Sequence, residues 1–84
     1  MNPIEIYTDA GRKAGLAAKR KDMGLLRHWN DWLSRALALE NPDRRKTFAR
    51  PWALDCAGGD KVISIIIFAP VWLTARYTHG MAWL

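Results

Sequence analysis

The charges of this chain stop abruptly at Lys61. From Val62 to Leu84 the only charged residue is Arg76, whereas residues 1–61 hold the rest of the 13 Lys/Arg and all 8 Asp/Glu. An apolar segment of this length has to be shielded from water by folding back on the chain, by a partner or by a lipid. The sequence therefore predicts a basic helical part, residues 1–60, joined to an apolar C-terminal segment, residues 61–84.

The length allows one small core. A chain of 84 residues buries about 60–65% of its unfolded surface, which leaves no room for a second core, so we expect a single domain over residues 1–84. Half of the residues are apolar and five are Trp. This composition argues against intrinsic disorder.

Cysteine content and charge limit the setting. Cys56 is the only cysteine, which excludes an internal disulfide and is typical of a reducing compartment. The amino terminus carries Glu5 and Asp9 and has no apolar run typical of a signal peptide, so we expect a cytoplasmic protein. A net charge of +5 and a pI near 9.9 favour acidic partners.

The first predicted helix is rich in alanine. Thr8 or Asp9 is a suitable cap for a helix that runs to about Lys21. The alternation of Ile4 to Thr8 favours a short strand or an irregular lead-in before it. One helical face carries small residues that allow close approach of another helix, namely Ala10, Ala14, Ala17 and Ala18.

The second predicted helix has the clearest apolar periodicity. Asp22 caps it, and it runs from Met23 to about Leu39. Its stripe consists of Leu25, Trp29, Trp32, Ala36 and Leu39, widened by Leu26, Leu33 and Leu37. We expect this helix, with Trp29 and Trp32, to form the structural centre.

The helix ends at Asn41-Pro42, after which Asp43 is a candidate cap. Residues 44–57 are again helical in pattern, but Pro51 lies inside them. Either the helix kinks there or a new helix begins with Pro51 in its first turn, and Gly58-Gly59 ends it in both cases.

The apolar segment is ambiguous. The β-branched run from Val62 to Phe68 suits a buried strand or a buried helix. Pro70 then begins a final piece that suits a strand, or a helix with Gly80 as its stop. The predicted fold is mainly α, a bundle of three to four helices with this segment packed as a buried helix or short β-hairpin; an α+β fold is the alternative.

Residues Gly15 to Pro42 resemble one tetratricopeptide unit. The letters ALALENP, Ala36 to Pro42, are similar to the end of that repeat's second helix and its proline turn. The first helix lacks the repeat's aromatic pattern, and no second copy follows at its period of about 34 residues. We therefore interpret the segment as a generic helical hairpin, and the resemblance implies no function.

Catalytic and metal-binding patterns are missing. His28, His79 and Cys56 show no zinc-ligand spacing, and no Ser lies in a nucleophile motif. Gly58-Gly59-Asp60-Lys61 lacks the full phosphate-loop spacing and is interpreted as a helix stop followed by a cap. We predict no enzyme activity, no cofactor and no metal.

Two basic clusters are the best functional candidates. They lie at the end of the first helix and after Pro42, where they are expected to form one cationic side. The candidate partner-binding residues are Lys19, Arg20, Lys21, Arg44, Arg45, Lys46 and Arg50.

The predicted function is binding. We expect a small accessory protein of a bacterium or bacteriophage that inhibits or modulates a larger complex through its basic helical surface, with an acidic protein surface as partner. A nucleic-acid binder using residues 19–21 and 44–50, and a protein attached to a membrane through residues 62–84, are the alternatives. A homodimer seam formed by the apolar segment is also open.

Overall fold

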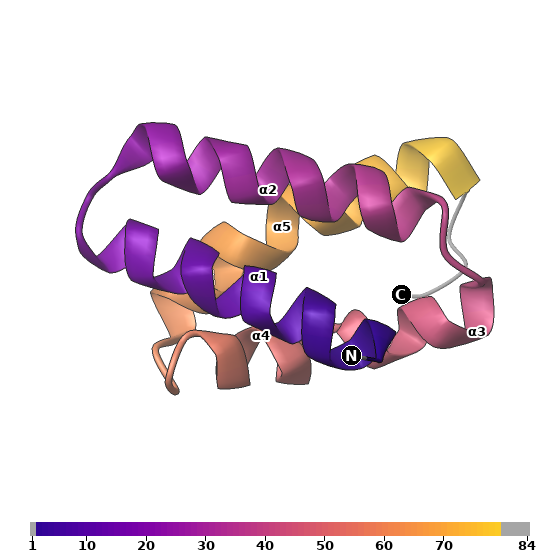
Figure 1. Cartoon of the computed structure of the whole chain (residues 1–84), viewed down its shortest axis with the longest axis horizontal. Helices are drawn as coiled ribbons and strands as arrows, with labels where there is room; N and C mark the ends of the chain where they lie inside the picture. Colours follow the sequence, from indigo (N-terminus) through magenta and orange to yellow (C-terminus); the bar gives the residue numbers. More distant parts are fainter. Residues whose placement is uncertain (1, 80–84) are drawn as a thin grey trace.

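The structure, a computed structural model, describes residues 2–79, and for Pro42 and residues 72–79 it describes the backbone alone. Over this range the fold is mainly α and has no strand. The elements are α1 (Pro3–Lys19), α2 (Met23–Ala38), α3 (Pro42–Arg45), the short 3-10 helix η1 (Lys46–Phe48), α4 (Arg50–Cys56) and α5 (Lys61–His79). Helices α1 and α2 form a hairpin, with α4 beside α1 and α5 running between them (Figure 1).

Helix α1 begins earlier than the sequence analysis predicts. The Asn2 side chain accepts a hydrogen bond from the Glu5 amide at 2.9 Å, and the Glu5 carboxylate accepts one from the Asn2 amide at 3.4 Å. With Pro3 in the first turn, this reciprocal cap starts the helix five residues before Thr8. The predicted strand or lead-in over residues 4–8 is therefore wrong.

The small-residue face of α1 is confirmed. Ala10, Ala14 and Ala17 are buried, and Gly11 and Gly15 are buried beside them. A β-carbon on Gly11 would lie 2.7 Å from Cys56 Sγ and from the Trp52 ring. Helix α4 therefore packs directly onto the backbone of α1, at a distance that only glycine permits.

Helix α2 is capped by Asp22, whose carboxylate accepts from the Leu25 amide at 3.1 Å. Its buried residues are Leu26, Leu33, Ser34 and Leu37, while Leu25 and Leu39 are exposed. The buried face of α2 is therefore rotated by about one residue from the predicted stripe. Trp29 and Trp32 are half-buried at the edge of this face.

Both prolines begin new helices, but the cap of α3 differs from the expected one. Asn41, not Asp43, caps α3, because the Asn41 side chain accepts from the Asp43 amide at 2.8 Å. Pro51 lies in the first turn of a new helix, α4, after the extended residue Ala49. The second of the two alternatives for Pro51 is thus confirmed.

Glycine and aspartate join α4 to α5. Gly58 and Gly59 have φ angles of 64° and 88°, and the Asp60 carboxylate accepts from the Val62 and Ile63 amides at 3.0 and 3.1 Å. The interpretation of this stretch as a stop and a cap is confirmed.

The apolar segment is one helix through Pro70, so the β-hairpin alternative and the start of a new piece at Pro70 are wrong. A proline inside a helix leaves the carbonyl four residues earlier without its usual N–H donor. That carbonyl belongs to Ile66, and the Asn30 side chain of α2 donates to it at 3.3 Å. The predicted stop at Gly80 lies outside the described residues.

Helix α5 contacts α1, α2 and α4, and its Ile63, Ile67 and Val71 are buried in the core. Its opposite face is apolar and exposed, with Val62, Ile65 and Ile66. None of the helices in residues 2–79 has the length and apolar character needed to cross a membrane.

Candidate functional site

The His, Cys and Ser side chains are the first candidates for chemistry. Among the side chains that the structure describes, residues 2–41 and 43–71, no three His, Cys, Asp or Glu are grouped to hold a metal ion. Cys56 is a buried thiol whose Sγ lies 3.9 Å from the Thr8 carbonyl oxygen, and burial raises its pKa to about 11. At neutral pH it is therefore protonated and a poor nucleophile. The Ser64 hydroxyl donates to the Lys61 carbonyl at 2.7 Å.

Two of the cations after Pro42 have acidic partners. Arg44 Nη1 lies 3.1 Å from Glu40 Oε1, and Lys46 Nζ lies 3.7 Å from Asp43 Oδ1. We call these four residues the paired end. Of the three consecutive cations Arg44, Arg45 and Lys46, the first and the third therefore have acidic neighbours.

Arg45, the third member, is inside the protein. Its side chain is 1% exposed, and Nε and Nη1 have no hydrogen-bond partner. Burying a charged side chain with two nitrogens that lack a hydrogen-bond partner is energetically costly. As placed in the structure, Arg45 cannot offer its charge to an external surface.

The paired end is further bound to α1 by Tyr7. The Tyr7 hydroxyl donates to Glu40 Oε2 at 2.8 Å. Desolvation, together with this bond, raises the pKa of Tyr7 to about 12, and the same bond lowers the pKa of Glu40. Tyr7 also packs edge-on against Phe48, with ring centroids 4.9 Å apart, so aromatic packing helps to hold the Tyr7 side chain next to Glu40.

Lys19, Arg20 and Lys21 are exposed and form no ion pair. Lys19 Nζ lies 3.7 Å from the place of a β-carbon on Gly58, so this turn borders the α4–α5 turn that leads to Lys61. Lys61 is also exposed and without an ion pair. We call Lys19, Arg20, Lys21 and Lys61 the basic end.

The backbone of the basic end is unusual at Lys21. The Lys21 and Asp22 amides donate to the Ala18 and Ala17 carbonyls, the two bonds of a Schellman cap. Lys21 has φ 57° at the position that glycine usually takes. Helix α4 ends in the same motif with Gly58 at that position, so the chain places a cation where glycine is less strained.

The two predicted clusters do not meet. The α1–α2 turn and α3 lie at opposite ends of the molecule (Figure 1). Helix α2 separates them by its 16 residues, about 24 Å at 1.5 Å per residue. The shared cationic side is thus absent, and Lys19, Arg20 and Lys21 are separated from Arg44 and Lys46.

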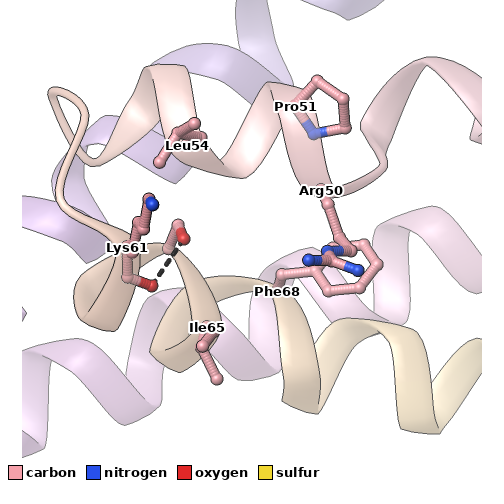
Figure 2. Close-up of a pocket in the computed structure, with 7 residues that line it drawn as sticks. Arg50, Pro51, Leu54, Lys61, Ile65 and Phe68 are labelled. Carbon is pink, nitrogen blue, oxygen red and sulfur yellow. Dashed lines mark hydrogen bonds between the residues drawn. The ribbon is translucent and has the colours of Figure 1, made fainter.

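Arg50 belongs to a different surface, a groove between α4 and α5 of about 650 Å³. Arg50 and Lys61 lie at opposite ends of the groove (Figure 2), and neither forms an ion pair. We call it the α4–α5 groove; it is lined by Arg50, Pro51, Leu54, Lys61, Ser64, Ile65 and Phe68.

Sequence reasoning missed the groove and Lys61. The signal is present in the spacing: Arg50 and Leu54 are four apart, and Lys61, Ile65 and Phe68 follow the i, i+4, i+7 pattern of one helix face. This spacing indicates a groove only when α5 is known to be a helix that packs beside α4.

Of the tryptophans, Trp29, Trp32 and Trp52 are half-buried, and Trp52 Nε1 donates to Thr8 Oγ1 at 3.1 Å. The side chain of Trp72 and the whole of Trp83 lie outside the described residues. Comparisons with family models, curated proteins and solved structures found no match for this chain, so its function has to be inferred from its own charges and contacts.

Proposed function

We propose that this chain is a small binding protein, not an enzyme, that engages an acidic surface of a larger protein through its basic end and modulates the complex it joins. The observation that carries the proposal is an asymmetry in charge pairing. Acidic side chains in residues 2–79 are all used internally, whereas the four cations of the basic end are not.

The acids divide into two groups. Glu5, Asp22 and Asp60 accept hydrogen bonds from amides at helix starts. The others pair with a cation: Asp9 with Lys13, Asp31 with Arg35, Glu40 with Arg44, Asp43 with Lys46 and Asp55 with Arg12. The four cations of the basic end are therefore without an ion pair, although the capping carboxylates of Asp22 and Asp60 lie next to them in the sequence.

Free cations that converge at one end attract an acidic partner over a Debye length of about 8–10 Å and raise its association rate. The strained backbone at Lys21 supports the same proposal, since a left-handed non-glycine residue costs about 1 kcal/mol or more and is commonly kept for function. The single free thiol agrees with a cytoplasmic setting.

The phosphate backbone of nucleic acid is the second candidate, because Lys19, Arg20 and Lys21 form an uninterrupted exposed basic run. An apolar groove beside the basic end favours protein over phosphate, since duplex backbones offer no apolar anchors. Salt dependence separates the two candidates: binding to a phosphate backbone falls by orders of magnitude when salt is raised to about 0.5 M.

The experiment compares two variants that each remove one Arg and one Lys. Arg20→Gln with Lys21→Gln changes the basic end, and Arg44→Gln with Lys46→Gln changes the paired end. Binding of a glutamate-rich peptide and of a short DNA duplex is measured by fluorescence anisotropy at several salt concentrations.

We expect the first variant to weaken peptide binding and flatten its salt dependence, and the second to leave both nearly unchanged. Equal effects of the two variants would contradict the proposal. Tighter binding of the duplex than of the peptide at every salt concentration would replace it with the nucleic-acid function.

A further inference from the structure

The α4–α5 groove combines an apolar floor with a cation at each end. Its floor consists of Pro51 and Leu54 from α4 and Ile65 and Phe68 from α5. Ile65 is 62% exposed, an unusual state for a large aliphatic side chain beside other apolar groups. Pro51, Leu54 and Ile65 are exposed, although Ile63, Ile67 and Val71 of the same helix α5 are buried in the core.

The groove has the length of a short helical segment. From Lys61 to Phe68 helix α5 rises about 10 Å, which is about two turns of a helix lying alongside it. Two turns present apolar side chains at i, i+3 or i+4, and i+7, the spacing by which amphipathic helices fill apolar grooves.

The charges at the ends select the occupant. Arg50 and Lys61 lack ion pairs, and the acids nearest in sequence are already used, since Asp55 pairs with Arg12 and Asp60 caps α5. A second copy of this chain would bring the same two cations and a net charge of +5 against the groove, which is unfavourable. A segment with carboxylates flanking its apolar residues would neutralise both ends.

We propose that the α4–α5 groove receives an amphipathic helix of a partner protein, whose apolar side chains lie on Leu54, Ile65 and Phe68 and whose flanking Asp or Glu side chains pair with Arg50 and Lys61. The inference rests on the proposed function and names the segment by which the acidic partner is held. Lys19, Arg20 and Lys21 then attract the partner as it approaches, and the groove holds the bound partner.

The test uses two synthetic peptides with the same glutamates. One carries leucines at i, i+4 and i+7, and the other carries alanines at those positions. Titration into the folded protein is followed by the amide resonances of residues 50–68 and by fluorescence anisotropy. The groove variant is Ile65→Ser; its matched control is Val62→Ser, on the same helix, 67% exposed and outside the groove.

We expect the leucine peptide to bind about tenfold or more tightly than the alanine peptide, with shifts centred on the groove. Ile65→Ser should remove most of that advantage, and Val62→Ser should not. Both positions are exposed, so both variants should remain folded, which their thermal unfolding verifies.

Other outcomes are decisive in different ways. Equal binding of the two peptides, sensitive only to Arg20→Gln with Lys21→Gln, would overturn the groove inference and leave the proposed function standing. A loss of leucine-peptide binding in Ile65→Ser with no effect of that double variant would support the groove and refute the role of the basic end. Sedimentation showing a dimer that Ile65→Ser dissociates would mean that the occupant is a second copy, which overturns the inference.

Discussion

The two ends of this molecule carry similar cations, but the cations form ion pairs with acids at one end and have no such partners at the other. At the paired end, Arg44 and Lys46 face Glu40 and Asp43, and a Tyr7 hydrogen bond and aromatic packing hold the arrangement. At the basic end, the turn from Lys19 to Lys21 has no acid within ion-pair distance and a strained backbone. The difference teaches that a run of Lys and Arg in sequence does not identify a charged surface, because pairing decides which charges remain available.

The comparison implies that substitutions at the paired end change stability and substitutions at the basic end change association. Phe48 gives the largest expected effect. It is fully buried and packs edge-on against Tyr7 and Trp52, with centroids 4.9 and 5.3 Å away. Phe48→Ala should lower the free energy of unfolding by about 3–5 kcal/mol.

Denaturant unfolding measures this loss. Leu39→Ala, at a position that is 90% exposed near the same end, should change stability by no more than about 0.5 kcal/mol. A Phe48→Ala protein as stable as the Leu39→Ala control would show that the contacts of Phe48 with Tyr7 and Trp52 do not support the fold.

Arg45 gives the next effect, of opposite sign. Replacing a buried guanidinium, two of whose nitrogens lack a partner, with an apolar chain of similar length removes a desolvation cost. Arg45→Met should therefore raise the free energy of unfolding by about 2 kcal/mol. A decrease in the unfolding midpoint would contradict the view that Arg45 is buried without a counter-ion.

Lys21 tests the other end of the molecule. Lys21→Gly relieves the left-handed backbone and should stabilise the protein by about 0.5–1 kcal/mol, as Gly58 does naturally in the matching motif of α4. The same change should weaken binding of an acidic peptide. Calorimetric unfolding and anisotropy on one preparation check both effects, and a variant that is less stable than wild type would remove the argument that strain is kept there for binding.

The smallest effect concerns pH. The folded-state pKa of Tyr7 is about 12, above its ordinary value of 10.0, so its contribution to stability is complete below pH 10 and is lost as pH rises toward 12. Tyr7→Phe should reduce the decline of stability over this range. The difference between variant and wild type cancels the titration of Cys56, and identical alkaline profiles would show that the Tyr7–Glu40 bond is not formed in solution.

Local signals in the sequence predicted much of the helical framework. Asp22 as a cap, the break at Pro42 and the stop at Gly58-Gly59 are confirmed, because each depends on a few neighbouring residues. The error at residues 4–8 has a local cause as well, since Ile4 and Ile6 alternate as in a strand while Asn2, Pro3 and Glu5 form a helix start that overrides this pattern.

The candidate site was less accessible to prediction. Consecutive helical residues point about 100° apart, so Arg44, Arg45 and Lys46 cannot share one face, yet which of them turns inward depends on how α3 sits on the core. The α4–α5 groove exists only because two helices lie side by side. The β-branched run from Val62 to Phe68 suits a strand as well as a helix, so the sequence alone does not predict this pair of helices.

The bond from Asn30 to the Ile66 carbonyl has a consequence for how this fold is specified. Apolar contact between α2 and α5 is not directional, whereas a hydrogen bond fixes one atom of each helix relative to the other. Pro70 leaves one unmatched acceptor at a single point along α5, and Asn30 is the donor that reaches it. The pair therefore sets the register of the two helices, and a second substitution that moved the proline by one turn would require the asparagine to move with it.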